Sequence, residues 1–579
     1  MVAGLRETIR REKAVWKTIH QSDSQLKKLE GTGNEQKAVE MITQIICPIY
    51  CAFQERPLYF QTNLNGLLVN NLVPMDMVHS FFLEYFEIVP ESLSIRFKKP
   101  PKSYRYADIS LISAIVYVVD IFTKFGDNPF HYHLTTTSDE LSYLALTFLN
   151  ASQFKRKKTH QALLALIVLT NGLFIFDNFE RTGEQLGSYP MFQLCLDLCY
   201  QMGLYTDPDT TSIFTLKEKA IIRLLPASKV NQVWNYMQTE DAFFSLKMGT
   251  PLLINYDFCE PYSRCSDLFF EMKREQGVLI MRQLSMLANS RKPVSIRDLL
   301  DMIHKVLDFC SQIPASMLEP GGFSGDLDEL AYWCKQKLIL LSSLHFLCRM
   351  VIVGITYIQY PADDIAGDMY RQLLISAVTI LNHIKYFCEG RSVFSDVKYL
   401  VYLKDIFSRT LGQGFITWFT FFLPKSEEEG QGMLQEMPYP KGSNIYSSEI
   451  DLCTLERALY HKTAEMDDLS EGIFNRLLSS SELMTFTRSL YDLLCQNEVM
   501  KNSLNSFFMI KHVLLWSYVA RTLEESPGMS FLDAVKSARR SVENHFLSGR
   551  LDEKSFVGDG CQLDQLLDSL FEWTGQDVN

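Results

Sequence analysis

The sequence lacks the motifs on which common enzyme classes depend. It has no glycine-rich dinucleotide loop, no phosphate-binding loop with Gly-Lys-Ser or Gly-Lys-Thr, and no Gly-x-Ser-x-Gly turn. His131 and His133 are close in sequence, but no third metal ligand follows at a recognisable spacing. A lone carboxylate such as Asp241 is more often structural than catalytic. We therefore expect no catalytic residue and no metal site, and not an enzyme.

Closely spaced cysteine pairs are also missing. The 13 cysteines are scattered singly, and no Cys-x-x-Cys occurs. The closest pairs, Cys47/Cys51 and Cys195/Cys199, lie one helical turn apart among apolar residues, which is typical of small buried hydrophobes. Nothing indicates a disulfide framework, and this pattern favours a reducing compartment.

No secretory signal or membrane span is expected. The basic N-terminus has no apolar run behind it. The apolar segment 163–176 is too short to cross a bilayer. Segment 338–358 is long enough, but His345 and Arg349 lie near its middle. Both segments are predicted to be core helices, with no membrane partner.

Excess basic charge is absent as well. The 579 residues carry a formal net charge of -12, with 47% hydrophobic and 21% charged residues. This composition is that of a globular chain with a sizeable core. An acidic body repels a phosphate backbone, so the bulk of the chain is not expected to bind nucleic acid.

Helical periodicity dominates from about residue 40 onward, and no alternating run is long enough to build a sheet. The spacing predicts a helix over 76–90 with Val78, Phe81, Phe82, Tyr85 and Val89 on one face. The remaining clear patterns predict helices over 138–152, 158–176, 188–203 and 230–247. We therefore predict an all-α fold, as a large helical domain.

Composition shifts divide the chain into five segments. The basic helix at the N-terminus is either a weak coiled coil or a helix packed on the body. Acidic residues, glycines and three prolines within 423–444 indicate a long surface loop or linker. The expected segments are 1–30 (basic helical arm), 40–424 (helical domain), 425–448 (acidic Gly/Pro loop), 449–555 (C-terminal helices) and 556–579 (acidic-hydrophobic tail).

Two turns and the helix between them follow a recognisable order. The first turn contains Gly203 and Leu204 followed by Asp207-Pro208, the helix supplies Trp234, Asp241 and Ser245, and the second turn contains Gly249, Thr250 and Pro251 with Asp257 beyond. This order resembles the middle homology region of fungal zinc-cluster (binuclear zinc, six-cysteine) transcription factors, over about residues 75–262. Two departures are Tyr205 in place of the usual His and Thr250 in place of the usual Arg.

The same positions have a structural interpretation. Glycines after helices suit left-handed caps, and the prolines end helices. Trp234 is interpreted as a core anchor. Asp241 either hydrogen-bonds a helix end or pairs with a cation. The candidate family-motif residues are Gly203, Asp207, Pro208, Trp234, Asp241, Gly249, Pro251 and Asp257.

The resemblance implies a nuclear regulatory and activating part of a factor that controls RNA polymerase II transcription. Its helical core would respond to a small apolar ligand or a partner protein. Zinc, and contact with DNA, would belong only to a six-cysteine cluster that this sequence does not contain. The arm 1–30 would suit the linker and homodimerisation helix that follow such a cluster. The alternative is a non-DNA-binding helical scaffold or cofactor relative of the family.

The last 24 residues combine acidic and bulky apolar side chains. Segment 556–579 has five acidic residues and no Lys or Arg. This composition is typical of amphipathic activation segments that bind coactivator or mediator-type proteins. A last helix docked on the body would use the same apolar residues. The candidate activation residues are Leu563, Leu566, Leu567, Leu570, Phe571 and Trp573.

Overall fold

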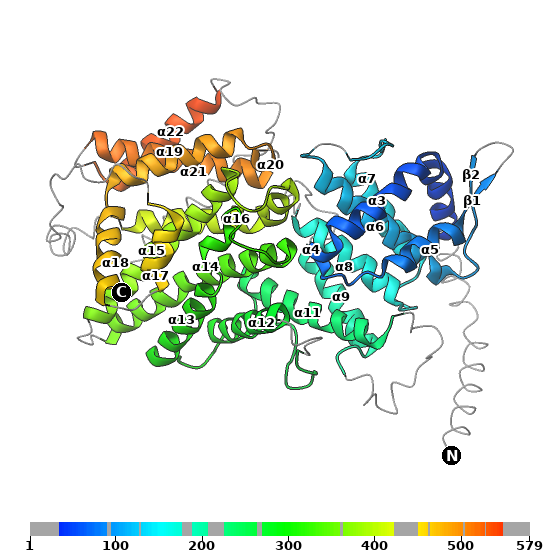
Figure 1. Cartoon of the computed structure of the whole chain (residues 1–579), viewed down its shortest axis with the longest axis horizontal. Coiled ribbons are helices and arrows are strands. Elements are labelled where there is room, and N and C mark those ends of the chain that lie inside the picture. Colours follow the sequence, from blue (N-terminus) through cyan, green and yellow to red (C-terminus); the bar gives the residue numbers. More distant parts are fainter. Residues whose placement is uncertain are drawn as a thin grey trace, which may run out of the picture. The chain divides into compact units, whose positions relative to one another are not determined.

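Helices dominate the computed structural model of the chain (Figure 1). The structure describes residues 34–89, 94–126, 129–175, 188–206, 225–262, 269–358, 363–421, 450–460, 464–501, 504–526 and 529–547. In this part of the chain the only strands are β1 (Phe86–Val89) and β2 (Ser94–Phe97). The all-α prediction is confirmed. The arm 1–30, the loop 425–448 and the tail 556–579, with its six candidate activation residues, lie outside the described residues.

The chain divides into two compact units, and each is described by itself. Unit 1 comprises Met1–Ile175, Leu186–Ser245 and Leu252–Val278. Unit 2 comprises Phe176–Gln185, Leu246–Pro251 and Leu279–Asn579. The division falls inside the segment 40–424 that the sequence predicted as one domain, and the helices on both sides of the predicted acidic loop belong to unit 2.

Unit 1 is built around α6 (Tyr106–Thr123), which packs against α3, α5, α7 and α8. Nearly every α6 residue is buried, as expected of a helix that is apolar all round. Gly172 of α8 lies against α6, where an added Cβ would come within 2.6 Å of the Tyr117 ring. The other elements are a helix over 34–41, η1 (Ile42–Ile46), η2 (Cys47–Ile49), α3 (Tyr50–Asn63), α4 (Asn65–Val69), α5 (Met75–Tyr85), η3 (Ser103–Arg105), α7 (Ser138–Ala151), α8 (His160–Ile175), α9 (Ser188–Met202), most of α11 (Ala227–Met248) and the start of α12 (Phe269–Ala288).

The predicted helices over 138–152, 158–176, 188–203 and 230–247 correspond to α7, α8, α9 and α11. The helix predicted over 76–90 is wrong beyond Tyr85. Val78, Phe81, Phe82 and Tyr85 are buried along α5 as predicted. Phe86 is extended, with φ -122° and ψ 133°, and begins a hairpin in which it pairs with Phe97. Aromatic and β-branched residues in 86–89 favour a strand, which local periodicity did not reveal.

Unit 2 is a stack of long helices. In it α14 (Leu327–Ile358) packs against α13 (Ile296–Ser311), α15 (Asp363–Cys388) and α16 (Val397–Thr420). Gly414 of α16 approaches α15 closely, since an added Cβ would lie 3.0 Å from the Leu381 side chain. The remaining elements are the last residues of α11, the second half of α12, η5 (Ala315–Leu318), α17 (Leu452–Tyr460), α18 (Ala464–Leu477), α19 (Ser480–Gln496), α20 (Glu498–Lys501), α21 (Leu504–Glu525) and α22 (Phe531–Leu547).

In the part of the chain that the structure describes, two helical stretches are long and apolar enough to cross a membrane by length and composition, Ser103–Thr123 and Leu327–Tyr357. Their most apolar windows are 89% and 56% buried inside the structure. His345, in the second stretch, is only 1% exposed. The first stretch has the burial of a core helix, and the second is covered on one side by α13, α15 and α16.

Candidate functional site

Trp234, one of the sequence-predicted motif residues, lies in the core of unit 1. It is 3% exposed, and its Nε1–H donates to the Glu260 carbonyl oxygen at 3.1 Å. The Tyr200 and Tyr205 rings meet its indole edge to face, with centroids 6.0 and 6.3 Å away. This placement agrees with the interpretation of Trp234 as a core anchor.

Asp241, two turns further along α11, holds the following loop in place. Its Oδ1 accepts the Leu253 N–H at 2.9 Å, and its Oδ2 accepts the Ile254 N–H at 3.2 Å. The Tyr256 hydroxyl donates to the same Oδ2 at 3.3 Å. The Leu253 and Ile254 amides belong to the loop after α11, so these contacts differ from the bond to a helix end that was one of the two roles left open for Asp241. A buried carboxylate with several donors is a structural element rather than a free catalytic base.

The two turns of the motif have the backbone expected of glycine caps. Gly203 and Gly249 have φ values of +74° and +65°, a region that favours glycine. After α9, the Leu204 N–H donates to the Cys199 carbonyl oxygen at 3.0 Å, which closes the helix end. Pro251 and Asp257 are exposed, and Asp207 and Pro208 lie outside the described residues.

A backbone contact joins the segments that follow α9 and α11. The Glu260 N–H donates to the Tyr205 carbonyl oxygen at 3.0 Å. Together with the indole bond of Trp234, this contact uses both backbone groups of Glu260. Trp234 and Asp241, with the segments that they bind, therefore form one local constellation, which connects the loop after α11 to the turn after α9.

No family model matches the chain, and no curated protein matches it.

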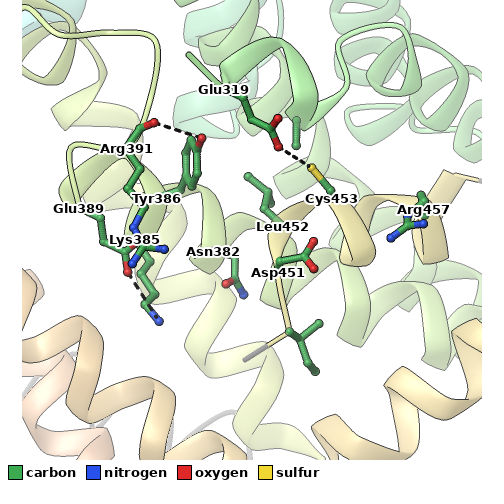
Figure 2. Close-up of a pocket in the computed structure, with 12 residues that line it drawn as sticks. Glu319, Asn382, Lys385, Tyr386, Glu389, Arg391, Asp451, Leu452, Cys453 and Arg457 are labelled. Atoms are coloured by element: carbon green, nitrogen blue, oxygen red, sulfur yellow. Dashed lines mark hydrogen bonds and ion pairs between the residues drawn. The ribbon is translucent and has the colours of Figure 1, made fainter. Parts of the chain in front are cut away.

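A charged groove in unit 2 is a second candidate site (Figure 2). It has a volume of about 490 Å³ and lies between η5, the C-terminal part of α15 and the beginning of α17. That size suits a small ligand. Its charged lining residues are Glu319, Lys385, Glu389, Arg391, Asp451 and Arg457.

The charges of the groove are held in place by local contacts. On the α15 side, Glu389 lies 3.8 Å from the Lys385 ammonium and 3.2 Å from the Arg391 guanidinium. On the α17 side, Asp451 accepts the Thr454 N–H at 2.7 Å and the Thr454 hydroxyl at 2.9 Å. These bonds make Asp451 an N-terminal cap of α17.

A buried ionic cluster next to the groove connects α17 to the rest of unit 2 through hydrogen bonds and an ion pair. The Glu456 carboxylate accepts hydrogen bonds from the Lys337 ammonium, from the Ala315 N–H at 2.6 Å and from His383 Nε2 at 3.0 Å. Lys337 also donates to the Ile313 carbonyl oxygen at 2.6 Å. Glu456 and Lys337 are 3% and 1% exposed, so this ion pair is desolvated.

The environment decides the charge of each member of this cluster. Burial alone would raise the pKa of Glu456, but Lys337 and His383 outweigh it and lower that pKa to about 2. Burial, with a smaller contribution from Lys337, lowers the pKa of His383 below its usual 6.5, against the opposing bond to Glu456. At pH 7 the carboxylate is therefore charged and His383 is neutral, donating its Nε2–H.

The groove is chemically suited to binding rather than to reaction. Cys453 is its one thiol among the lining residues, and its Sγ–H donates to the Glu319 carboxylate at 3.6 Å. Burial, followed by that carboxylate, raises the pKa of the Cys453 thiol to about 11. A thiol that stays protonated at pH 7 is a poor nucleophile.

Neither the groove nor the ionic cluster was predicted from the sequence. The groove has the size expected for a ligand site, but its lining is charged, whereas the resemblance implied an apolar ligand. The groove therefore does not support the prediction of an apolar ligand, which stays a prediction. Among the described residues no group of three His, Cys, Asp or Glu side chains could hold a metal ion.

Proposed function

We propose that the chain is the regulatory and activating part of a fungal zinc-cluster transcription factor that acts in the nucleus on RNA polymerase II transcription. The constellation around Trp234 carries the proposal. Two of the residues that resemble the family motif, Trp234 and Asp241, lie on one helix and bind the loop that follows it. This arrangement supports a scaffold role for these two residues.

The tail supplies the activating part of the proposal. Segment 556–579 pairs five acidic residues with bulky apolar residues. Acidic residues keep such a segment in water until a coactivator groove accepts its apolar face as a helix, at the cost of ordering it. Aromatic anchors dominate grooves of this kind, so Phe571 and Trp573 should contribute most to binding.

A reporter fusion tests the proposal. Residues 556–579 joined to an unrelated DNA-binding domain should activate a reporter gene, and the Phe571→Ala, Trp573→Ala double variant should lose most of that activity. Asp559→Asn is the matched control, because it removes one charge and no apolar anchor. A silent wild-type fusion would remove the support that the tail gives to an activating function. The non-DNA-binding scaffold or cofactor would then be the better description.

A further inference from the structure

We propose that the groove between α15 and α17 binds a zwitterion, either a free amino acid or a short peptide with an unblocked ammonium and an unblocked carboxylate. That this ligand regulates transcription rests on the proposed function. That the groove binds a zwitterion rests on the residues of the groove alone.

The two walls of the groove carry opposite charge. Figure 2 shows Lys385 and Arg391 with Glu389 on one side, and Glu319 and Asp451 with Arg457 on the other. Two cations and one carboxylate leave the first wall with a net positive charge, whereas two carboxylates and one cation leave the second wall with a net negative charge. A ligand carboxylate would lie against the first wall and a ligand ammonium against the second.

This arrangement discriminates against other ligand classes. An anion such as phosphate would meet Glu319 and Asp451, and a polyamine would meet Lys385 and Arg391, so each would be repelled by one wall. An apolar molecule would desolvate these charged groups without pairing them, which is costly. A ligand with an ammonium and a carboxylate a few bonds apart can pair its carboxylate with the first wall and its ammonium with the second.

The groove is also preorganised for such a ligand. The Lys385 side chain is 7% exposed, with its ammonium 5.6 Å from the Phe486 ring centroid, and it lies beside Glu389. Asp451 is fixed by its bonds to Thr454. The helix that Asp451 caps, α17, is held to the rest of unit 2 by Glu456. Lys385 and Asp451 would therefore need little ordering on binding, which favours affinity.

Thermal unfolding of the full chain with defined probes tests the proposal. The probes are an equimolar mixture of the common amino acids, the dipeptide alanylalanine, and alanylalanine acetylated at its amine and amidated at its carboxylate. At a concentration about 100 times Kd, a ligand of the folded state should raise the melting temperature by about 3 °C or more. The amino acids or the free dipeptide should do so, and the blocked dipeptide should not.

Two charge-removing variants locate the site. Asp451→Asn keeps a capping side chain, and Arg391→Gln changes a side chain that is 70% exposed, so neither should unfold the chain. Each should weaken binding of the free probe about tenfold, the usual effect of losing a charged contact. Asp396→Asn is the matched control for the first, because Asp396 caps α16 through the Lys398 N–H at 2.9 Å. Arg521→Gln, in an exposed pair with Glu525, is the control for the second.

Three results would overturn the proposal: no melting shift with either free probe, an equal shift with the blocked dipeptide, or unchanged affinity in both groove variants. These outcomes are independent of the reporter assay. If the tail fusion activates the reporter but the chain binds no zwitterion, the proposed ligand class is wrong and the proposed function stands. If the chain binds a zwitterion but the tail fusion is silent, the ligand class stands and the activating function loses its support.

Discussion

Removing the charge of Glu456 should destabilise unit 2 severely. Glu456→Gln keeps the shape of the side chain and an oxygen for the Ala315 N–H, but it leaves the Lys337 ammonium buried without its carboxylate. Breaking a buried ion pair from one side typically costs about 3–5 kcal/mol, because the remaining charge is uncompensated. With Lys337 1% exposed, water cannot reach the ammonium without local opening of the structure.

Urea unfolding of the full chain, followed by the fluorescence of the buried tryptophans, measures this loss. Trp333 and Trp418 of unit 2 are each 1% exposed and report on that unit. Glu525→Gln is the matched control, since Glu525 and Arg521 are 58% and 53% exposed and the pair contributes little. Replacing both buried partners, Glu456→Leu with Lys337→Met, should recover much of the stability. Equal midpoints for Glu456→Gln and the control would refute this account of the cluster.

Three further predictions concern stability and DNA. Trp234→Ala should cost about 3–5 kcal/mol through lost burial and a cavity, and an unchanged melting temperature would contradict its core position. Burial, followed by Arg349, lowers the pKa of His345 to about 3. Its contribution to stability is therefore complete above pH 6.5 and falls by about 1.4 kcal/mol per unit as pH drops toward 3. His345→Leu should remove that slope in urea unfolding at several pH values, and identical slopes would show that the imidazole is not responsible. The chain, with its charge of -12, should bind duplex DNA no tighter than about micromolar in gel-shift assays at about 0.15 M salt, so a sequence-selective nanomolar complex would contradict the charge argument.

Much of the helical framework could be predicted because its cause is local. Four predicted helices correspond to α7, α8, α9 and α11, whose apolar residues recur at helical spacing. The error at 86–89 arises because a strand depends on its partner and not on local spacing alone. Phe86 and Val89 continue the apolar spacing of α5, yet their pairing with Phe97 and Ser94 depends on a strand that follows in sequence.

The groove could not be predicted because its residues converge only in the folded chain. Glu319, Lys385 and Asp451 come from three separate segments, and none belongs to a motif. Glu456 lies in an amphipathic helix, where an acidic residue normally faces water. The sequence contains one indication of a buried ion pair, because its partner Lys337 lies at the start of a long apolar run. A lysine at that position is equally typical of a side chain that extends from the end of an apolar helix into water.

Tethering the full chain at a promoter tests the central claim most directly. Fused to an unrelated DNA-binding domain, the 579-residue chain should activate a reporter gene, and deletion of 556–579 should abolish that activation while leaving the fusion folded and abundant. The Trp234→Ala fusion should lose activity only in proportion to its lost abundance, because Trp234 supports the scaffold. A tethered chain that is abundant but leaves the reporter unchanged, or that activates equally without its tail, would contradict the account.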